Sequence, residues 1–233
     1  KILTIMSNQY GTEKIVTDGL VLCLDTNAST SYPGSGTDWI DLAGYDDFTI
    51  NGAYTYSSDP GYLNLNGVTA TSDSGSSPPS AWQGTVDCTI DLWYRMQGMY
   101  GGCCPTIFGR YNFRFFHIGN NMYTMIGFHD GSGGRTYQHP SYNMASEPGG
   151  TAAWHHVVGM RRSDRYIIWI DGTEKYDNAF GAGLALYGAN NEGYYVNATT
   201  HNADYAVARI WNRGLSDDEI LHNFNAQRSR YGL

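Results

Sequence analysis

The feature that most constrains the fold of this chain is a series of short runs in which apolar and polar residues alternate. The clearest run covers residues 86–96 and separates a mostly apolar face from a mostly polar one. The first face holds Cys88, Ile90, Leu92 and Tyr94, and the second holds Asp87, Thr89, Asp91 and Trp93. Because side chains that alternate with a period of two point to opposite faces of a β-strand, this run predicts a strand with one face in a core.

Further strands are predicted at short intervals. Residues 62–67 alternate strictly and end in Asn-Gly, a strong signal for a tight turn. The other predicted strands cover residues 19–25, 106–110, 113–119, 121–128, 154–162, 165–172 and 206–213. The chain has 29 glycines and 19 tyrosines but only 14 lysines and arginines. This balance favours short strands joined by turns and excludes a helical bundle.

One helix is predicted, over residues 216–228. Ser216 is its expected N-cap, and Glu219 stands three residues later, where a capping box requires it. An apolar stripe formed by Ile220, Leu221 and Phe224 is expected to pack against the rest of the molecule.

The 233 residues are predicted to form one domain, over residues 19–233, preceded by an N-terminal arm over residues 1–18 that lies outside the core. No composition break or internal repeat after residue 19 marks a second domain. Short strands at regular spacing with one terminal helix indicate a sandwich or a barrel, and the order of the strands alone does not choose between them.

Charge and hydropathy exclude two classes of partner. The formal net charge is −8 and no basic run is present, whereas nucleic-acid binding needs lysines and arginines that displace counterions. No stretch approaches the roughly 18 apolar residues of a membrane span. We therefore predict neither a nucleic acid nor a membrane as partner. The four cysteines, interpreted as free thiols, are Cys23, Cys88, Cys103 and Cys104. A disulfide from Cys103 or Cys104 to Cys23 or Cys88 remains an open alternative.

Three segments resemble a known family. They cover residues 88–96 with 107–110 (CTIDLWYRM, IFGR), 154–174 (WHHVVGMRRSDRYIIWIDGTE) and 203–220 (ADYAVARIWNRGLSDDEI). Their order and form resemble the concanavalin A-like lectin/glucanase superfamily, in particular its laminin-G-like modules. The resemblance implies an all-β fold: a two-sheet antiparallel jelly-roll sandwich with one short C-terminal helix.

Two further segments are similar to laminin-G-like proteins of tailed phages, notably those of marine bacteria and cyanobacteria. They cover residues 18–44 (DGLVLCLDTNASTSYPGSGTDWIDLAG) and 223–233 (NFNAQRSRYGL). This similarity implies a virion component, such as a capsid decoration protein or a tail-fibre module. The expected location is the virion surface, and the expected partners are capsid or other virion proteins, with the chain as a homo-oligomer or in many copies on a particle.

No catalytic motif is found. Retaining glycosidases need two carboxyl groups about 5–5.5 Å apart, and no pair of glutamates has the required spacing on a strand. Asp87 and Asp91 share a face of their predicted strand, but we interpret them as solvated side chains. Serine-hydrolase, P-loop and zinc motifs are also missing. His155 and His156 are expected to point to opposite faces of a strand, one in the core and one at the surface. The chain is therefore predicted not to be an enzyme.

No cofactor or metal site is predicted. Calcium remains an open alternative, because it prefers oxygen ligands and the chain is rich in loop aspartates, although no calcium-binding loop motif occurs and no ligand set can be assigned. The aspartates in question are Asp41, Asp46, Asp47, Asp130, Asp171 and Asp204.

Two aromatic and amide clusters are the candidate ligand-binding residues. The first consists of Tyr137, His139, Tyr142 and Asn143, and the second of Asn190, Asn191, Tyr194 and Tyr195. Such loops suit protein contacts, which we favour, as well as glycan contacts. The sequence thus predicts a non-catalytic virion surface protein, a capsid decoration protein in the first place. The alternative is a carbohydrate-binding module of a tail fibre or a secreted protein that recognises a host-surface glycan.

Overall fold

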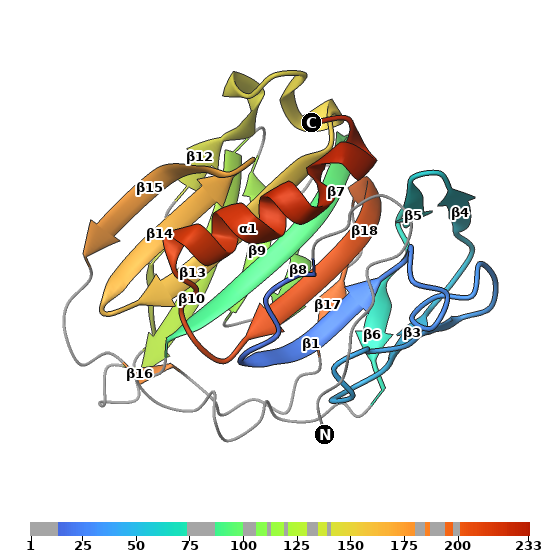
Figure 1. The fold of residues 1–233 in the computed structure, drawn as a ribbon, viewed down its shortest axis with the longest axis horizontal. Coiled ribbons are helices and arrows are strands. Elements are labelled where there is room, and N and C mark those ends of the chain that lie inside the picture. The colour runs from blue at the N-terminus through green and yellow to red at the C-terminus, as the bar shows by residue number, and fades with distance from the viewer. Residues whose placement is uncertain are drawn as a thin grey trace.

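The computed structural model describes residues 14–73, 87–99, 106–110, 113–118, 121–129, 135–138, 141–179, 185–186, 194–197 and 201–233. In this part of the chain, antiparallel strands form two sheets, and one α-helix lies outside them (Figure 1). The predicted jelly-roll sandwich with one short C-terminal helix is confirmed. No helix among the described residues has the length and apolar character needed to cross a membrane.

The first sheet, called sheet A, contains the longest strands. In spatial order it consists of β15 (Thr173–Ala179), β14 (Arg165–Ile170), β13 (His155–Arg162), β7 (Cys88–Met99), β18 (His201–Trp211), β5 (Gly61–Asn64) and β4 (Thr55–Ser58), and β1 (Leu20–Asp25) also pairs with β18. The turn between β14 and β15 is made by Asp171 and Gly172, both with positive φ, as expected for the predicted Asp-Gly hairpin turn.

The second sheet, called sheet B, faces the inner side of sheet A. Its order is β11 (Arg135–Gln138), β10 (Asn121–His129), β9 (Phe113–Ile118), β8 (Thr106–Arg110), β17 (Tyr195–Val196), β6 (Ala70–Ser72), β3 (Phe48–Ile50) and β2 (Asp38–Trp39), with β12 (Ser141–Asn143) and β16 (Ala185–Leu186) also paired to β10. Strands β8, β9 and β10 form the predicted meander. Two short 3-10 helices, η2 (Met144–Ser146) and η3 (Gly150–Ala152), follow β12.

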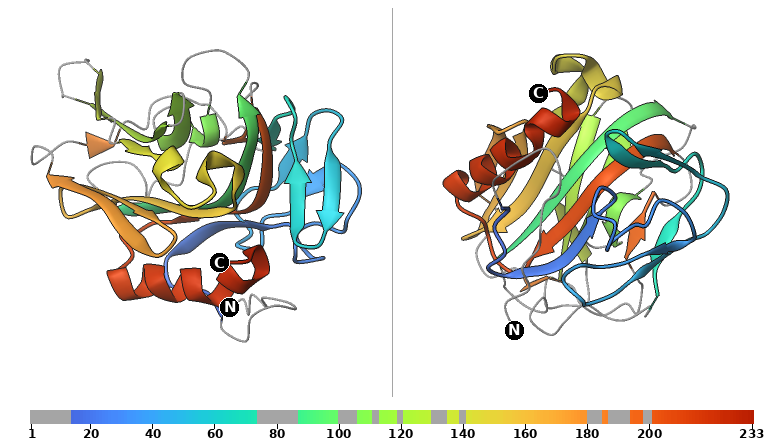
Figure 2. Two further views of the ribbon diagram at one scale, coloured as in Figure 1. Left: turned by 90° about the horizontal axis from the view of Figure 1, so that it is seen from above. Right: turned by 45° about the vertical axis from the view of Figure 1, so that its right-hand side comes forward.

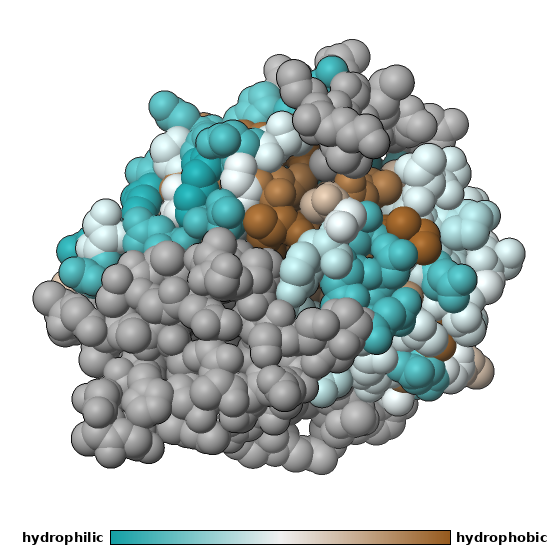
Figure 3. Space-filling view, turned by 90° about the horizontal axis from the view of Figure 1, so that it is seen from below, coloured by the Kyte–Doolittle hydropathy of each residue, from teal (hydrophilic) through white to brown (hydrophobic). Residues whose placement is uncertain are grey.

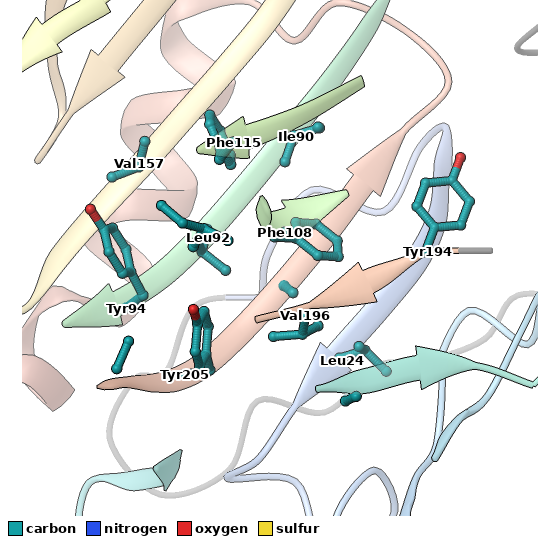
Figure 4. Packing of buried hydrophobic residues seen from close by; sticks show 14 of the residues in the cluster. Leu24, Ile90, Leu92, Tyr94, Phe108, Phe115, Val157, Tyr194, Val196 and Tyr205 are labelled. Atoms are coloured by element: carbon teal, nitrogen blue, oxygen red, sulfur yellow. The ribbon is translucent and has the colours of Figure 1, made fainter. Parts of the chain in front are cut away.

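The main core lies between the two sheets. Figure 4 shows Leu92 and Tyr205 of sheet A with Phe108 and Phe115 of sheet B among its side chains, and all four are at most 1% exposed. All four residues predicted for the apolar face of the 86–96 run belong to this core, which confirms the alternation.

A helix covers part of the outer face of sheet A. Helix α1 (Asp217–Gln227) continues into the 3-10 helix η4 (Arg228–Tyr231), and both lie on the side of sheet A that faces away from sheet B (Figure 2). The predicted capping box is present: the Ser216 hydroxyl accepts from the Glu219 N–H, and the Glu219 carboxylate accepts from the Ser216 N–H. Ile220 and Phe224 are buried as predicted.

The predicted stripe is wrong for Leu221, whose side chain is 43% exposed. It stands one position after Ile220, about 100° around the helix, which turns it away from the sheet.

The end of the predicted arm also covers part of the outer face of sheet A. Ile15 is buried, the Val16 N–H donates to Asn223 Oδ1 at 2.8 Å, and Trp211 Nε1 donates to the Val16 carbonyl at 3.1 Å. Residues 14–18 therefore contact the sheet and the helix.

Figure 3 views the lower end, where apolar surface of the described residues gathers near the middle of the view and hydrophilic surface borders it. The strands β7 and β18 reach the upper end in Figure 1, where β7 ends and β18 begins. Polar side chains gather on the outer face at that upper end, and they form the site described next.

Candidate functional site

Asp91, interpreted from the sequence as solvated, is completely buried. It points from β7 to the outer face of sheet A, where α1 covers it. His156 Nε2 lies 2.9 Å from Asp91 Oδ2, and Arg209 NH1 lies 3.5 Å from the same oxygen. Arg209 also donates to Gln227 Oε1 of α1. The expectation of a solvated Asp91 is therefore wrong, because the C-terminal helix seals this face of the strand.

The electrostatics of Asp91 suit a structural role. Burial raises the pKa of the carboxyl, but attraction by His156 and Arg209 outweighs burial and holds that pKa below its usual range. The carboxylate is thus ionised, paired and without access to a ligand. Asp87, near the start of the same run, accepts from the Ser163 N–H at 3.0 Å in the hairpin that joins β13 and β14. These two aspartates do not form a carboxylate pair in a cleft.

The adjacent histidines point to opposite faces, as predicted, but neither lies at the surface: both are at most 1% exposed. His155 Nδ1 lies 2.7 Å from Asp171 Oδ2 and its Nε2 lies 2.7 Å from the Gly150 carbonyl, while His156 stacks on Trp93 under α1. Burial lowers the pKa of His155, but its hydrogen bonds to Asp171 and Gly150 outweigh burial and raise it. The surface position predicted for one histidine is wrong because both faces of β13 are covered.

Among the described aspartates considered for calcium, protein groups engage Asp41, Asp47, Asp171 and Asp204. The Asp41 carboxylate accepts backbone N–H groups of Cys23, Ala43, Tyr45 and Asp46 at 2.7–3.2 Å. Burial raises the Asp41 pKa more than these hydrogen bonds lower it. Within the described residues, no three His, Cys, Asp or Glu side chains gather as a metal site. Asp130 lies outside those residues.

The first predicted ligand cluster is only partly described, and Tyr142 is its informative member. The Tyr142 hydroxyl donates to Glu147 Oε1 at 2.5 Å, Lys175 Nζ lies 2.9 Å from the same oxygen, and the ammonium group stands 5.4 Å from the centre of the Tyr142 ring. Asn143 is exposed and caps η2 by accepting from the Ala145 N–H. Tyr142 is half-buried against the main core.

Of the remaining predicted residues, the structure describes Tyr194 and Tyr195 and the backbone of Tyr137. Tyr194 is 1% exposed and packs in the core between the sheets (Figure 4), so it supports the fold rather than contacting a ligand. Tyr195 is half-buried in β17, and Tyr137 is placed only by its backbone, in β11, where it pairs with Gly127. His139, Asn190 and Asn191 lie outside the described residues.

Five polar residues converge at the upper end of sheet A, and we call them the Asp204 cluster. Asp204 Oδ2 accepts from Arg95 Nε and NH2, both at 2.7 Å, and from Gln97 Nε2 at 2.9 Å. Asp204 Oδ1 accepts from Asn64 Nδ2 at 2.6 Å, and the same amide donates to Asn202 Oδ1 at 3.0 Å.

The cluster lies on the outer face of the sheet, because the neighbouring residues on these strands belong to the inner core. Figure 1 shows that α1 does not reach β5 and β4, which lie to its right. The side chain of Asp204 is 2% exposed, whereas that of Arg95 is 27% exposed and Gln97 is exposed. The cluster therefore has a buried carboxylate at its base and amide and guanidinium groups at its surface.

Aromatic rings border the cluster on the side of the helix. The Arg95 guanidinium stands 5.3 Å from the centre of the Tyr62 ring and 5.1 Å from that of Trp154. Trp154 packs in turn against Tyr231 of η4, with ring centroids 4.9 Å apart. Tyr62 is half-buried, while Trp154 is 7% exposed. These contacts fix the position of Arg95 from two sides.

This arrangement has the chemistry of a recognition surface for polar ligands. Ligand sites combine apolar or aromatic surface with a few placed polar groups, and rigidly held groups reduce the entropic cost of binding. Sequence reasoning named only Asp204 among the five residues, and as a calcium ligand. The available signal was that Asn64, Arg95, Gln97 and Asp204 occupy outward positions of predicted strands or of their continuations.

Comparisons with known proteins agree with the fold. The family model described as "Concanavalin A-like lectin/glucanases superfamily" matches residues 66–221. The binding domain of Paraclostridial Mosquitocidal Protein 1 superposes with a TM-score of 0.68 at 14% identity, covering 89% of this chain and 52% of that chain. The binding domain of Botulinum Neurotoxin DC, in complex with SialylT, gives 0.65 at 16% identity, covering 89% and 51%.

Trypanosoma rangeli sialidase is also similar in structure, with a TM-score of 0.59 at 15% identity, covering 92% of this chain and 34% of that chain. At these identities the similarity concerns the fold. The chain spans about half the length of the two binding domains. No curated protein matches the chain in sequence.

Proposed function

The chain belongs to the concanavalin A-like lectin/glucanase superfamily, and we propose that it is a non-catalytic, lectin-like module that binds glycans through the Asp204 cluster. The observation that carries this proposal is the convergence of guanidinium, carboxylate and amide groups beside the half-buried ring of Tyr62. Sugars present hydroxyl groups that donate and accept hydrogen bonds, and they have apolar C–H faces that pack on aromatic rings. The cluster offers both kinds of partner on one surface.

The absence of catalysis in this proposal is supported by the state of two described carboxylates, those of Asp91 and Asp204. Asp91 is sealed under α1, and Asp204 accepts hydrogen bonds from three side chains. A general acid or nucleophile needs access to substrate, and a glycosidase needs two such groups at a set distance. An activity screen on chromogenic glycosides is expected to be blank, and turnover that the variant Asp204→Asn abolishes would refute this part of the proposal.

The binding proposal is tested on a glycan array with the labelled protein. Replacing Asn202 by alanine removes one amide of the cluster, and the loss of a neutral hydrogen bond is expected to weaken binding about 2- to 10-fold. Asn178 is exposed on β15, at the opposite edge of sheet A, so Asn178→Ala is the matched control and leaves binding unchanged. A silent array, or equal loss in both variants, would overturn the proposal.

Tyr142 marks a second candidate surface for glycan or protein contact. Its ring is half-buried, and Lys175 and Glu147 hold it in place, so it offers a rigid aromatic edge with two charges. Tyr137, His139 and Asn143 are proposed as further ligand contacts of this cluster. On the same array, Tyr142→Ala weakens binding if this surface contacts the ligand, and leaves it intact if the Asp204 cluster alone does so.

We also propose a setting for the module: the surface of a tailed-phage particle, where many copies contact capsid proteins or tail proteins. The proposal stems from the two segments similar to phage proteins, residues 18–44 and 223–233. These segments contact each other, since Arg230 of the second lies 3.1 Å from Asp25 of the first and both side chains are buried. The phage-like features thus belong to one continuous part of the molecule.

The setting is tested on purified native particles. Mass spectrometry is expected to detect the chain in stoichiometric copy number, and cryo-electron microscopy should place symmetry-related copies on the shell or the tail. Particles that lack the chain would rule out this setting without affecting the glycan proposal.

A further inference from the structure

We infer that the Asp204 cluster selects uncharged, hydroxyl-rich saccharides and disfavours sialylated or otherwise anionic ones. This inference rests on the proposed glycan-binding function and specifies its ligand class. It follows from three observations on the described residues: the state of the Arg95 charge, the chemistry of the exposed groups and the charge of the whole chain.

The positive charge of Arg95 is already neutralised. Its Nε and NH2 atoms both lie 2.7 Å from Asp204 Oδ2, and its guanidinium is held beside the rings of Tyr62 and Trp154. Asp204 leaves Arg95 NH1 unused, but an anionic ligand that contacted NH1 would share this cation with a carboxylate that is 2% exposed. Because the nearby carboxylate already cancels the charge of this cation, an added anion gains little net attraction from the pair.

The other exposed groups are neutral amides. Within the described residues, the hydrogen bonds of the cluster leave two acceptors, Asn64 Oδ1 and Gln97 Oε1, and several donors, on Arg95 NH1, Asn202 Nδ2 and Gln97 Nε2. A site with both acceptors and donors suits hydroxyl groups, which accept and donate. A carboxylate is an acceptor only, so it could use the donors but would leave the two acceptor oxygens without partners.

The charge of the whole chain acts in the same direction. The formal net charge of −8 gives a field that repels anions and lowers their local concentration, most strongly at low ionic strength. A strongly cationic surface would be needed to offset this repulsion, and the Arg95–Asp204 pair contributes no net charge.

The test compares lactose with 3′-sialyllactose, and matched neutral and sialylated pairs on other backbones, by calorimetry and on the array. The wild-type protein is expected to bind the neutral member at least 10-fold more tightly. Asp204→Asn releases the charge of Arg95 and should raise the ratio of sialylated to neutral affinity about 10-fold. Asp177→Asn is the control, because it releases exposed Arg165 at the far edge of sheet A and changes the total charge equally. In Asp177→Asn, the ratio of sialylated to neutral affinity is expected to stay at the wild-type value.

The outcomes separate the inference from the function on which it rests. Binding of no saccharide of either class overturns the proposed function. Preference of the wild-type protein for sialylated members overturns the inference and leaves glycan binding in place. An unchanged ratio in folded Asp204→Asn also overturns the inference. Should that variant fail to fold, Arg95→Gln replaces it: the neutral preference is retained if the inference holds, and a shift toward sialylated ligands overturns it.

Discussion

Replacing Asp91 by asparagine is expected to destabilise the protein strongly, because it removes the anion of a buried charge cluster. Asp91, His156 and Arg209 are each fully buried, and Arg209 links the cluster to Gln227 of α1. Removing one partner of a buried ion pair costs about 3–5 kcal/mol, since the remaining charge stays desolvated. For a chain of this size, about 1 kcal/mol lowers Tm by roughly 2–4 °C, so a decrease of about 6–20 °C is expected.

The assay is thermal and urea unfolding followed by circular dichroism, with near-ultraviolet signals from Trp93 reporting on the packing beside His156. Asp177→Asn is the control, because it removes an equal charge from a pair with Arg165 that is largely exposed. A double-mutant cycle of Asp91→Asn with Arg209→Met measures the coupling directly. If Asp91→Asn lowered Tm no more than Asp177→Asn does, the inference that this buried pair stabilises the helix-covered face would be refuted.

The same variant changes the response to acid. The pKa of Asp91 is lower in the folded state than in an unfolded chain, where it is near 4. Its contribution to stability is therefore complete above the unfolded pKa and is lost as the pH falls through the folded value. Wild-type unfolding curves should lose stability in that range, and Asp91→Asn, which has no such carboxyl, should lose less between neutral pH and pH 3.

Three further predictions concern the helix, its contact with a turn and a buried thiol. Ser216→Ala removes the N-cap and is expected to cost about 1 kcal/mol, read as a Tm lower by roughly 2–4 °C. Gly172→Ala should destabilise more than Gly44→Ala in urea unfolding: both glycines have positive φ, but an added Cβ at 172 would lie 2.6 Å from the Phe224 ring, whereas the space around 44 is open. Burial raises the pKa of Cys23 to about 12, so iodoacetamide at pH 8 should label its peptide only after unfolding, as mass spectrometry will show.

The sequence predicts the strands, turns and helix well because their signals are local. The alternation in residues 86–96, the Asp171-Gly172 turn and the Ser216–Glu219 capping box each involve neighbouring residues, and each is present as predicted. Burial of the second face of a strand is not a local property. Asp91 is covered by a helix that begins more than 120 residues later in the chain, and no pattern around Asp91 records that contact.

The candidate site was missed for a related reason. Asn64 and Arg95 reach Asp204 across 140 and 109 residues of sequence, so only the pairing of β5, β7 and β18 brings them together. Composition instead led to the prediction that tyrosine-rich segments bind a ligand, but Tyr194, from one of these segments, packs in the core. Clusters of aromatic residues in a sequence do not distinguish rings that pack inside a sandwich from rings that are exposed on it.

The extent of the helical cover explains how one sheet face can have two roles. Asp91 and Asp204 both point outward from neighbouring central strands, and each pairs with an arginine from the adjacent strand. Under α1, the Arg209 side chain is 1% exposed, so the Asp91–Arg209 pair can only stabilise the docked helix. Beyond η4, the Arg95 side chain is 27% exposed and borders the exposed amide of Gln97. The proposed recognition of a polar ligand on this face is therefore confined to the part of sheet A that the C-terminal segment leaves open. Closer to α1, the equivalent Asp91–Arg209 pair is buried and contributes only to the stability of the fold.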